Sequence, residues 1–272
     1  GFSTRDGGII TFEDPIIELV LMAVMLLGAM NFTLLWAAFS GRFRAFRENT
    51  EVFYLTLVIT IAVFAVVVVF LIGEGQGDFV SGFRGTIFTA ISALTTTGFT
   101  NAVAQPGINA RDDLVPVLAP VLIIGLVLVG GAAGSTTGGM RLMRVAVLFK
   151  QARRELLRLS HPHGIRVLRL GKQRIDNAAV WSVWSFFFLL ILVLAAIALA
   201  MAFFGLAPEA AVAAAVVAVS NAGPFLHTVT PEAPAYAEMR DGAKVVLVLG
   251  MLAGRVELLA LLSLLNPAFW RR

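Results

Sequence analysis

Long apolar stretches that alternate with shorter ones are the feature that most constrains the fold of this chain. A helix needs about 20 apolar residues to cross the hydrocarbon core of a bilayer, which is roughly 30 Å thick. The short stretches Arg84–Leu94 and Pro208–Ser220 would rise only about 15–20 Å, so we expect each to enter the membrane and return. The long stretches predict spanning helices over Ile16–Phe39, Val52–Ile72, Leu114–Val129, Ala178–Phe204 and Val245–Leu265.

Apolar residues make up 58% of the 272 positions and charged residues 14%. Blocks of this kind are typical of an all-α polytopic membrane protein and not of a soluble enzyme. The chain has no cysteine, its histidines show no HExxH spacing, and the acids within spans, Glu18 and Glu257, belong to no acid–base or nucleophile set. We therefore expect no enzymatic activity and no cofactor.

The distribution of charge predicts the orientation of the helices. The connection from Arg141 to Arg174 carries ten basic residues against the single acid Glu155, which places it in the cytoplasm by the positive-inside rule. Such a cluster can also bind nucleic acid or lipid headgroups. The orienting role requires no further function, so we expect contact with membrane lipid and no nucleic-acid partner.

Both short stretches end on small polar residues. The first closes on Ala93–Asn101 and the second on Ser220–Phe225. A half-helix directs the negative end of its dipole into a wet cavity, and the free carbonyls beyond it can replace the water around a cation. Threonine hydroxyls extend the row of acceptors, and Gly98 permits the backbone angles that turn carbonyls inward. The pattern predicts an ion-selective constriction.

The same order of segments recurs along the chain. A long stretch, a short stretch, a polar glycine segment and a second long stretch occur twice, and Gly1 begins a third, partial copy. Because the chain starts at Gly1 without a methionine, we expect a fragment of a longer protein. The predicted units are residues 1–47, the end of one repeat, residues 48–160 and residues 161–272.

The glycine loop, Gly130–Gly139, interrupts what would otherwise be one long helix. A phosphate-binding loop would need a lysine and a preceding strand, both of which the sequence lacks here. A patch of small residues that lets helices pack closely remains an alternative interpretation of this segment. Ten residues without a bulky apolar side chain exceed what a contact patch requires, so we favour a flexible intramembrane loop on the cytoplasmic side of the constriction.

Arg255 lies about halfway along the last long stretch. An arginine at that depth costs at least about 2.5–3.5 kcal/mol unless it faces water or a partner. Glu257 is two residues away and so does not face it on a helix. We expect Arg255 to be held by carbonyls and hydroxyls of the glycine loop, where its charge would oppose permeating cations.

These motifs together resemble the pore-forming subunit of the Trk/Ktr/HKT superfamily of potassium transporters, most similar to the bacterial TrkH branch. The resemblance covers essentially the whole chain and implies membrane–pore–membrane repeats around a central pore in the bacterial inner membrane. It also implies potassium as the transported ion, a homodimer, and a TrkA-like cytosolic nucleotide-binding regulatory subunit. It rests on Thr95–Thr100, the glycine loop with Met140-Arg141, Lys150-Gln151 with Arg153–Glu155, Asn221–Pro224 and Gly254–Glu257.

The resemblance assigns residues to an ion filter and a gate. Its potassium ligands would be the carbonyls of Thr97, Gly98, Asn221 and Gly223. In the other filter segments the glycine is followed by phenylalanine. In the fourth filter segment, Asn221–Pro224, Gly223 is followed by Pro224-Phe225, so this segment is not equivalent to the others. The filter residues are Gly1, Phe2, Thr96, Thr97, Gly98, Phe99, Asn221, Ala222, Gly223 and Pro224, and the gate residues are Gly130, Gly131, Gly134, Ser135, Thr136, Thr137, Gly138, Gly139 and Arg255.

A secondary transporter that holds a small solute between broken helices is the competing class. It would explain the interrupted helices and Arg255, which could clamp a carboxylate. It does not predict short helices that always enter from the acidic side. The residues themselves do not distinguish potassium from sodium, and that preference follows from the resemblance alone.

Overall fold

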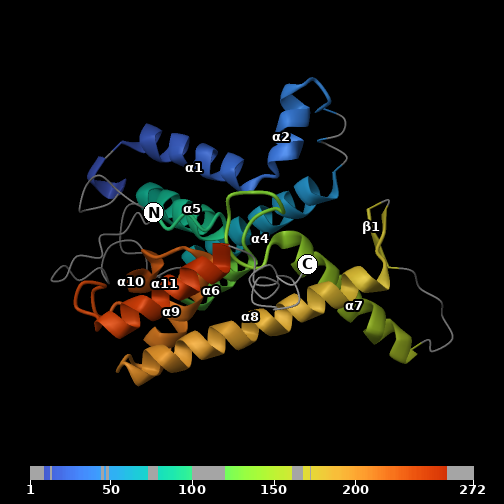
Figure 1. Cartoon of the computed structure of the whole chain (residues 1–272). Helices are drawn as coiled ribbons and strands as arrows, with labels where there is room; N and C mark the ends of the chain where they lie inside the picture. Colours follow the sequence, from blue (N-terminus) through green and yellow to red (C-terminus); the bar gives the residue numbers. More distant parts are fainter. Residues whose placement is uncertain are drawn as a thin grey trace.

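The computed structural model describes residues 9–12, 14–43, 46, 49–72, 79–99, 120–160, 168–171 and 173–255. Helices dominate this part of the chain, as the sequence predicts (Figure 1). The helices are η1 (Ile9–Phe12), α1 (Pro15–Ala29), α2 (Phe32–Phe39), α4 (Thr50–Ile72), α5 (Phe79–Leu94), α6 (Pro120–Val129), α7 (Leu142–Ser160), α8 (Asn177–Phe203), α9 (Pro208–Ser220), α10 (Phe225–Val229) and α11 (Asp241–Arg255), and the strands are β1 (Arg169–Leu170) and β2 (Gln173–Arg174).

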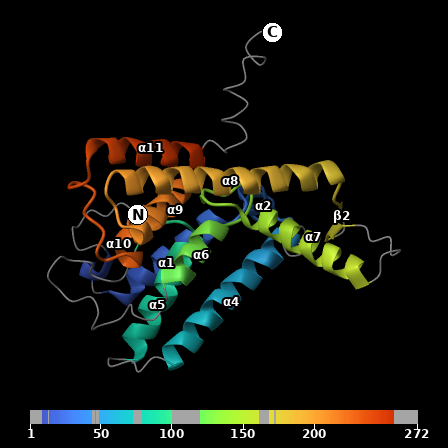
Figure 2. The ribbon, with the colours of Figure 1, turned by 90° about the horizontal axis from the view of Figure 1, so that it is seen from below.

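The largest core surrounds the short helix α9. Ten of its 13 residues are buried, nearly all of them alanine or valine. The small side chains let both α8 and α11 pack closely against α9 (Figure 2). The predicted bounds of this helix, Pro208–Ser220, are confirmed.

The predicted continuous helix over Ile16–Phe39 is wrong. The chain bends by 106° between α1 and α2. The carbonyl of Ala29 accepts a hydrogen bond from the Ala132 N–H at 2.9 Å, and the side chain of Asn31 accepts from the Thr33 N–H at 3.0 Å. The glycine loop therefore satisfies the end of α1, while Asn31 caps the start of α2.

The short helix α5 begins at Phe79, five residues before the predicted Arg84. It packs against α1, α4 and α6. An ion pair fixes it to α1, because the Arg84 Nε lies 2.6 Å from a carboxylate oxygen of Glu18, whose side chain is only 6% exposed. Glu18, an acid within a predicted span, is therefore the partner of an arginine on α5.

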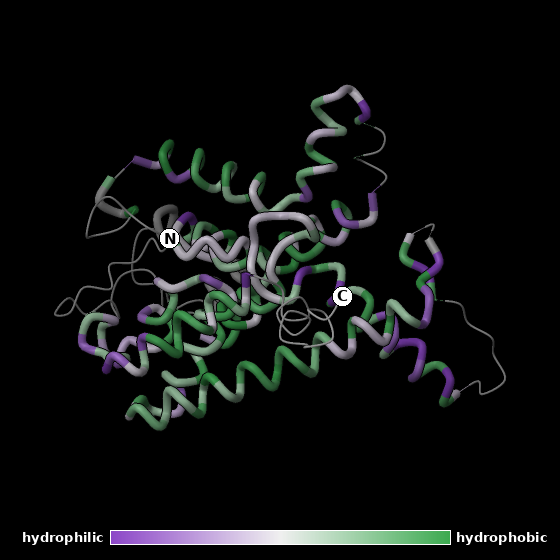
Figure 3. Tube along the Cα trace, in the orientation of Figure 1, coloured by the Kyte–Doolittle hydropathy of each residue, from purple (hydrophilic) through white to green (hydrophobic). Residues whose placement is uncertain are grey.

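Among the described residues, α8 is the one helix long and apolar enough to cross a membrane unaided, and the bent pair α1–α2 would make a second. Apolar residues colour α8 along most of its length (Figure 3). Helix α4 reaches 23 residues, close to the predicted Val52–Ile72. The first residues of the predicted Leu114–Val129 span and the last ones of Val245–Leu265 lie outside the described part of the chain.

Helix α7 leaves the glycine loop and carries the basic connection away from the core. The hairpin of β1 and β2 pairs Arg169 with Arg174 and follows it (Figure 1). Buried Val147, Leu168 and Val180 join α7, the hairpin and the start of α8 into a small separate cluster. The two strands are too short to change the all-α class.

Candidate ion filter and gate loop

The third segment, Thr95–Phe99, continues from the end of α5 in a strained backbone conformation. Thr96 and Gly98 have φ angles of 51° and 89°. Only glycine adopts such angles without steric cost, which is why the predicted filter glycine stands at position 98. The hydroxyls of Thr95 and Thr97 hydrogen-bond each other at 2.8 Å.

The fourth segment, Asn221–Pro224, is stabilised by different partners. Asn221 ends α9 with φ 57°, and its side-chain amide donates to the Met251 carbonyl of α11 at 3.1 Å. The hydroxyl of Tyr236 donates to the Gly223 carbonyl at 2.7 Å. Pro224 is the N-cap of α10, so the chain returns to helix directly after the segment.

The two segments are in direct contact. A Cβ atom built on Gly98 would lie 2.9 Å from Cδ of Pro224 and 3.6 Å from the carbonyl carbon of Ala222. The helices α5 and α9 therefore end next to each other, although their last residues, Leu94 and Ser220, are 126 positions apart in the sequence. Gly1 and Phe2, the predicted second segment, lie outside the described residues.

The glycine loop is non-helical, as predicted, and is closed by its own hydrogen bonds. The Met140 N–H donates to the Leu128 carbonyl at 2.8 Å, which brings the two ends of the loop together. Inside, the Ser135 and Thr137 hydroxyls pair at 2.7 Å, and the Gly131 N–H donates to Thr137 Oγ1 at 3.1 Å. Gly130, Gly134 and Gly139 have φ angles of 65°, 71° and 77°, which explains the spacing of these glycines.

The loop reaches both filter segments through Gly138. Its N–H donates to the hydroxyl oxygen of Thr96 at 2.8 Å. A Cβ atom at Gly138 would lie 2.1 Å from the Ser220 carbonyl oxygen at the end of α9, so a residue with a side chain does not fit there. The loop therefore lies against the ends of both α5 and α9.

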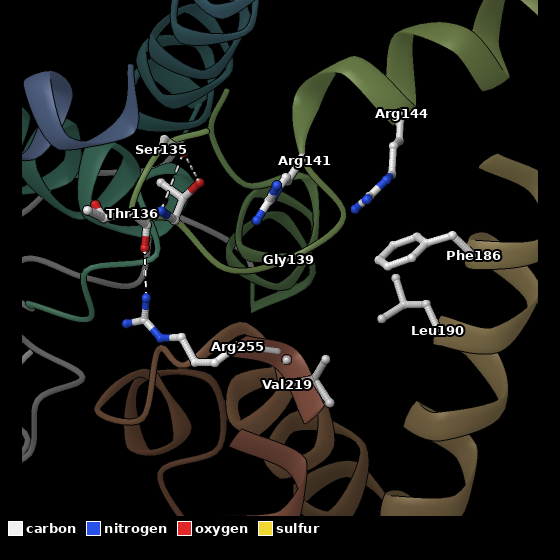
Figure 4. Close-up of a pocket in the computed structure, with 11 residues that line it drawn as sticks. Ser135, Thr136, Gly139, Arg141, Arg144, Phe186, Leu190, Val219 and Arg255 are labelled. Carbon is white, nitrogen blue, oxygen red and sulfur yellow. Dashed lines mark hydrogen bonds between the residues drawn. The ribbon is translucent and has the colours of Figure 1, made fainter. Parts of the chain in front are cut away.

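Arg255 contacts the loop as the sequence predicts. Its guanidinium NH1 donates to the Thr136 carbonyl at 3.0 Å (Figure 4). The same figure shows Arg141 and Arg144 on the other side of a cavity of about 120 Å³ that Arg255 also lines. Three guanidinium groups around this cavity make it unfavourable for a cation.

Sequence reasoning missed Tyr236, which lies in the connection between α10 and α11. Burial raises the pKa of its phenol to about 12, so the hydroxyl remains a donor at every physiological pH. His227 packs against its ring edge to face at a centroid distance of 5.7 Å. The sequence signal for the contact between Tyr236 and Gly223 is weak, because it consists of one tyrosine near a predicted filter segment.

In the described ranges, no group of three or more His, Cys, Asp or Glu residues could hold a metal ion. The oxygens near Gly98 and Gly223 are backbone carbonyls and hydroxyls. Such oxygens suit a weakly held monovalent cation that must also leave. The assignment of individual residues to filter and gate stays a prediction.

Comparison with known proteins identifies the family. The family described as "TrkH: Cation transport protein" matches residues 87–270, more than half of the 272 residues. The Trk system potassium uptake protein TrkH of Salmonella typhimurium is 32% identical over the whole chain, and that of Vibrio parahaemolyticus is 33% identical. In both cases the chain covers 54% of the relative.

A solved structure agrees with these matches. The crystal structure of the potassium transporter TrkH from Vibrio parahaemolyticus superimposes with a TM-score of 0.89 at 31% sequence identity. The match covers 100% of this chain and 56% of that one, so the chain spans about half the length of the relatives it matches. The family model, the curated relatives and the solved structure agree, and the chain belongs to the TrkH family of cation transport proteins.

Proposed function

We propose that the protein takes up potassium across the bacterial inner membrane, through a filter to which the third and fourth segments contribute. The observation that carries the proposal is the contact of Gly98 with Pro224, because it brings two half-helix ends to one point. The relatives are named potassium uptake proteins, which favours potassium and does not favour the carrier of a small organic solute.

The glycine loop and Arg255 serve as the gate in this proposal. The loop lies against both pore-helix ends through Gly138, and Arg255 holds it through the Thr136 carbonyl. A positive charge beside the pathway raises the energy of a permeating cation, while the loop narrows the pathway. The filter sorts ions and the loop limits their flux.

The remaining assignments rest on the resemblance and on charge. The basic connection that contains α7 faces the cytoplasm, where a TrkA-like nucleotide-binding subunit would associate. A homodimer is the proposed assembly. The repeat bounds at residues 47 and 160 follow the same pattern of segments.

Uptake measurements on loop and arginine variants test the gate. In cells that lack other potassium uptake systems, deletion within Ala132–Gly138 and, separately, Arg255→Ala should each raise the flux through the full-length protein without changing selectivity. The two changes remove one barrier, so the double variant should give much less than the sum of their effects. Additive effects, or flux that stays the same while the protein is present in the membrane, would show that the loop serves helix packing instead.

A further inference from the structure

A second, larger cavity is lined by residues of α7, of the hairpin and its connections, and of the start of α8. Figures 1 and 2 show where these elements meet. Its volume is about 860 Å³, within the range of sites that hold small ligands. Polar residues of α7 form one wall and aromatic residues of α8 the other. The walls include Gln151, Arg154, Arg158, Trp181, Trp184 and Phe188.

The polar wall contains a buried donor and a buried acceptor with nothing to bind among the described residues. Glu155 accepts from the Gln151 amide at 2.8 Å and from the terminal nitrogens of Arg154 and Arg158 at 3.4 and 3.3 Å. The Arg154 Nε and the Gln151 Oε1 are buried and find no hydrogen-bond partner in that part of the chain. The Arg154 side chain is only 16% exposed. A ligand that carries both an anionic acceptor and a donor would satisfy both atoms.

The aromatic wall is exposed and lies at the beginning of the helix best able to cross a membrane. The Trp181 side chain is 73% exposed and that of Phe188 is 62% exposed. Trp184 stacks on Phe188 with ring centroids 5.6 Å apart. Tryptophans beside arginines at the end of a spanning helix are typical of the level of the lipid headgroups.

We propose that this groove binds a phospholipid with an anionic, hydroxyl-bearing headgroup, of the phosphatidylglycerol type. The phosphate oxygens accept from the Arg154 Nε, with Arg158 at the rim. A headgroup hydroxyl donates to the Gln151 Oε1, and the acyl chains lie along Trp181 and Phe188. This site requires only that α8 crosses the membrane, so it does not depend on the ion that the filter selects.

Tryptophan fluorescence of the full-length protein in vesicles tests the site, because brominated acyl chains quench tryptophans that they touch. The signal of Trp181 and Trp184 is the difference between the protein and its Trp181→Phe/Trp184→Phe variant. Brominated phosphatidylglycerol should quench this signal several-fold more effectively, at equal mole fraction, than brominated phosphatidylcholine. Arg154→Gln should abolish the preference.

Arg153→Gln is the matched control, since Arg153 is an exposed neighbour on the same helix that does not line the cavity. It removes the same charge from α7 and should leave the preference unchanged. Arg154→Lys keeps the charge without the Nε donor, so it should retain only part of the preference for phosphatidylglycerol. A partial preference in this variant would show that the loss in Arg154→Gln does not result from a folding defect.

Three results would overturn the proposal. Equal quenching by both lipids would mean unspecific lipid around α8. Quenching by neither lipid would mean that protein, such as a second copy of the chain, covers the groove. Loss of the preference in Arg153→Gln as well as in Arg154→Gln would mean that overall basic charge, and not the built groove, attracts the lipid.

Discussion

The third and fourth segments meet at one point, yet they are held by different parts of the chain. The third segment is tied to the glycine loop, since Thr96 accepts a hydrogen bond from Gly138. The fourth is tied to the connection after α10 and to α11, through Tyr236 and Asn221. The loop is hydrogen-bonded to the third segment and only packs against the end of α9, so we expect its movement to affect the third segment more than the fourth.

Helices α5 and α9, which precede these segments in the sequence, differ in the same way. Helix α5 is polar in places and is fixed to α1 by the ion pair of Arg84 with Glu18. Helix α9 is held by close packing, because a Cβ atom on Gly254 of α11 would lie 1.8 Å from the Val219 carbonyl oxygen. An ion pair tolerates small displacements, while contact of two backbones does not.

The largest effect is expected at this backbone contact. Gly254→Ala would force α11 away from α9 and should destabilise the protein by about 3 kcal/mol or more, because the clashing atom belongs to the backbone. Gly125→Ala is the control, since a Cβ atom there would meet nothing within 4 Å. Thermal unfolding of the purified full-length protein in detergent measures the change in stability of both variants. If Gly254→Ala and Gly125→Ala unfold at the same temperature, the packing of α11 does not hold α9.

A glycine exchange within the filter is expected to have the next largest effect. Gly98→Ser places a side chain at φ 89° and next to Pro224, which costs roughly 1–2 kcal/mol from the left-handed backbone alone. The potassium-to-sodium permeability ratio should fall, because relief of this strain displaces the backbone carbonyls of the third segment from the geometry that the ion requires. Gly223→Ser should cost less, since a Cβ atom there would meet only the Tyr236 hydroxyl at 3.9 Å. An unchanged ratio in Gly98→Ser would remove the third segment from the filter.

The bond between the loop and the third segment should have a moderate effect. Thr96→Val removes the acceptor of the Gly138 N–H and leaves a buried donor unsatisfied, a loss of about 1–3 kcal/mol. The loop should then open more often and raise the potassium flux several-fold in uptake assays. Thr96→Ser keeps the hydroxyl and should behave like the natural protein. If the serine variant raises flux as much as the valine variant, the hydrogen bond does not hold the gate.

The smallest effect is expected at the fourth segment. Tyr236→Phe removes the donor to the Gly223 carbonyl, worth about 0.5–1.5 kcal/mol. Selectivity should fall by a small factor, while the opening of the gate, measured from single-channel currents, should not change. A change in gating equal to that of Thr96→Val would contradict the division between the two segments.

Alkaline pH offers a separate test of Tyr236. Its pKa is raised from the usual 10.0 to about 12 in the folded protein, so the folded state retains the proton that the unfolded state loses. The contribution of this residue to stability is complete below pH 10 and is lost as the pH rises towards 12. The natural protein should therefore lose more stability than Tyr236→Phe over this window and the same amount below it, as measured by chemical denaturation.

Much of this arrangement can be predicted from sequence because membrane helices follow simple rules of length and polarity. Pro208–Ser220 is too short to span, and its proline and terminal asparagine define both ends of α9. The hydrogen bond of Arg255 to the glycine loop follows from the cost of an unpartnered charge.

The features that the sequence does not predict are contacts between distant parts of the chain. The bend at Asn31 depends on hydrogen bonds to residues 100 positions later, which no local pattern reveals. Apolar composition alone could not distinguish one long helix over Ile16–Phe39 from two short ones. Tyr236 acts through a single hydroxyl, and Glu18 through an arginine on another helix. Neither carries a periodic signal.

The central claim is that the third and fourth segments bind the permeating cation together. Anomalous diffraction from crystals of the full-length protein soaked in rubidium or thallium would locate the ion directly. The account predicts anomalous density within coordination distance of the carbonyls of Thr97, Gly98, Asn221 and Gly223. Density elsewhere along the pathway, with none beside Gly98 and Gly223 in protein that still transports the soaked ion, would contradict it.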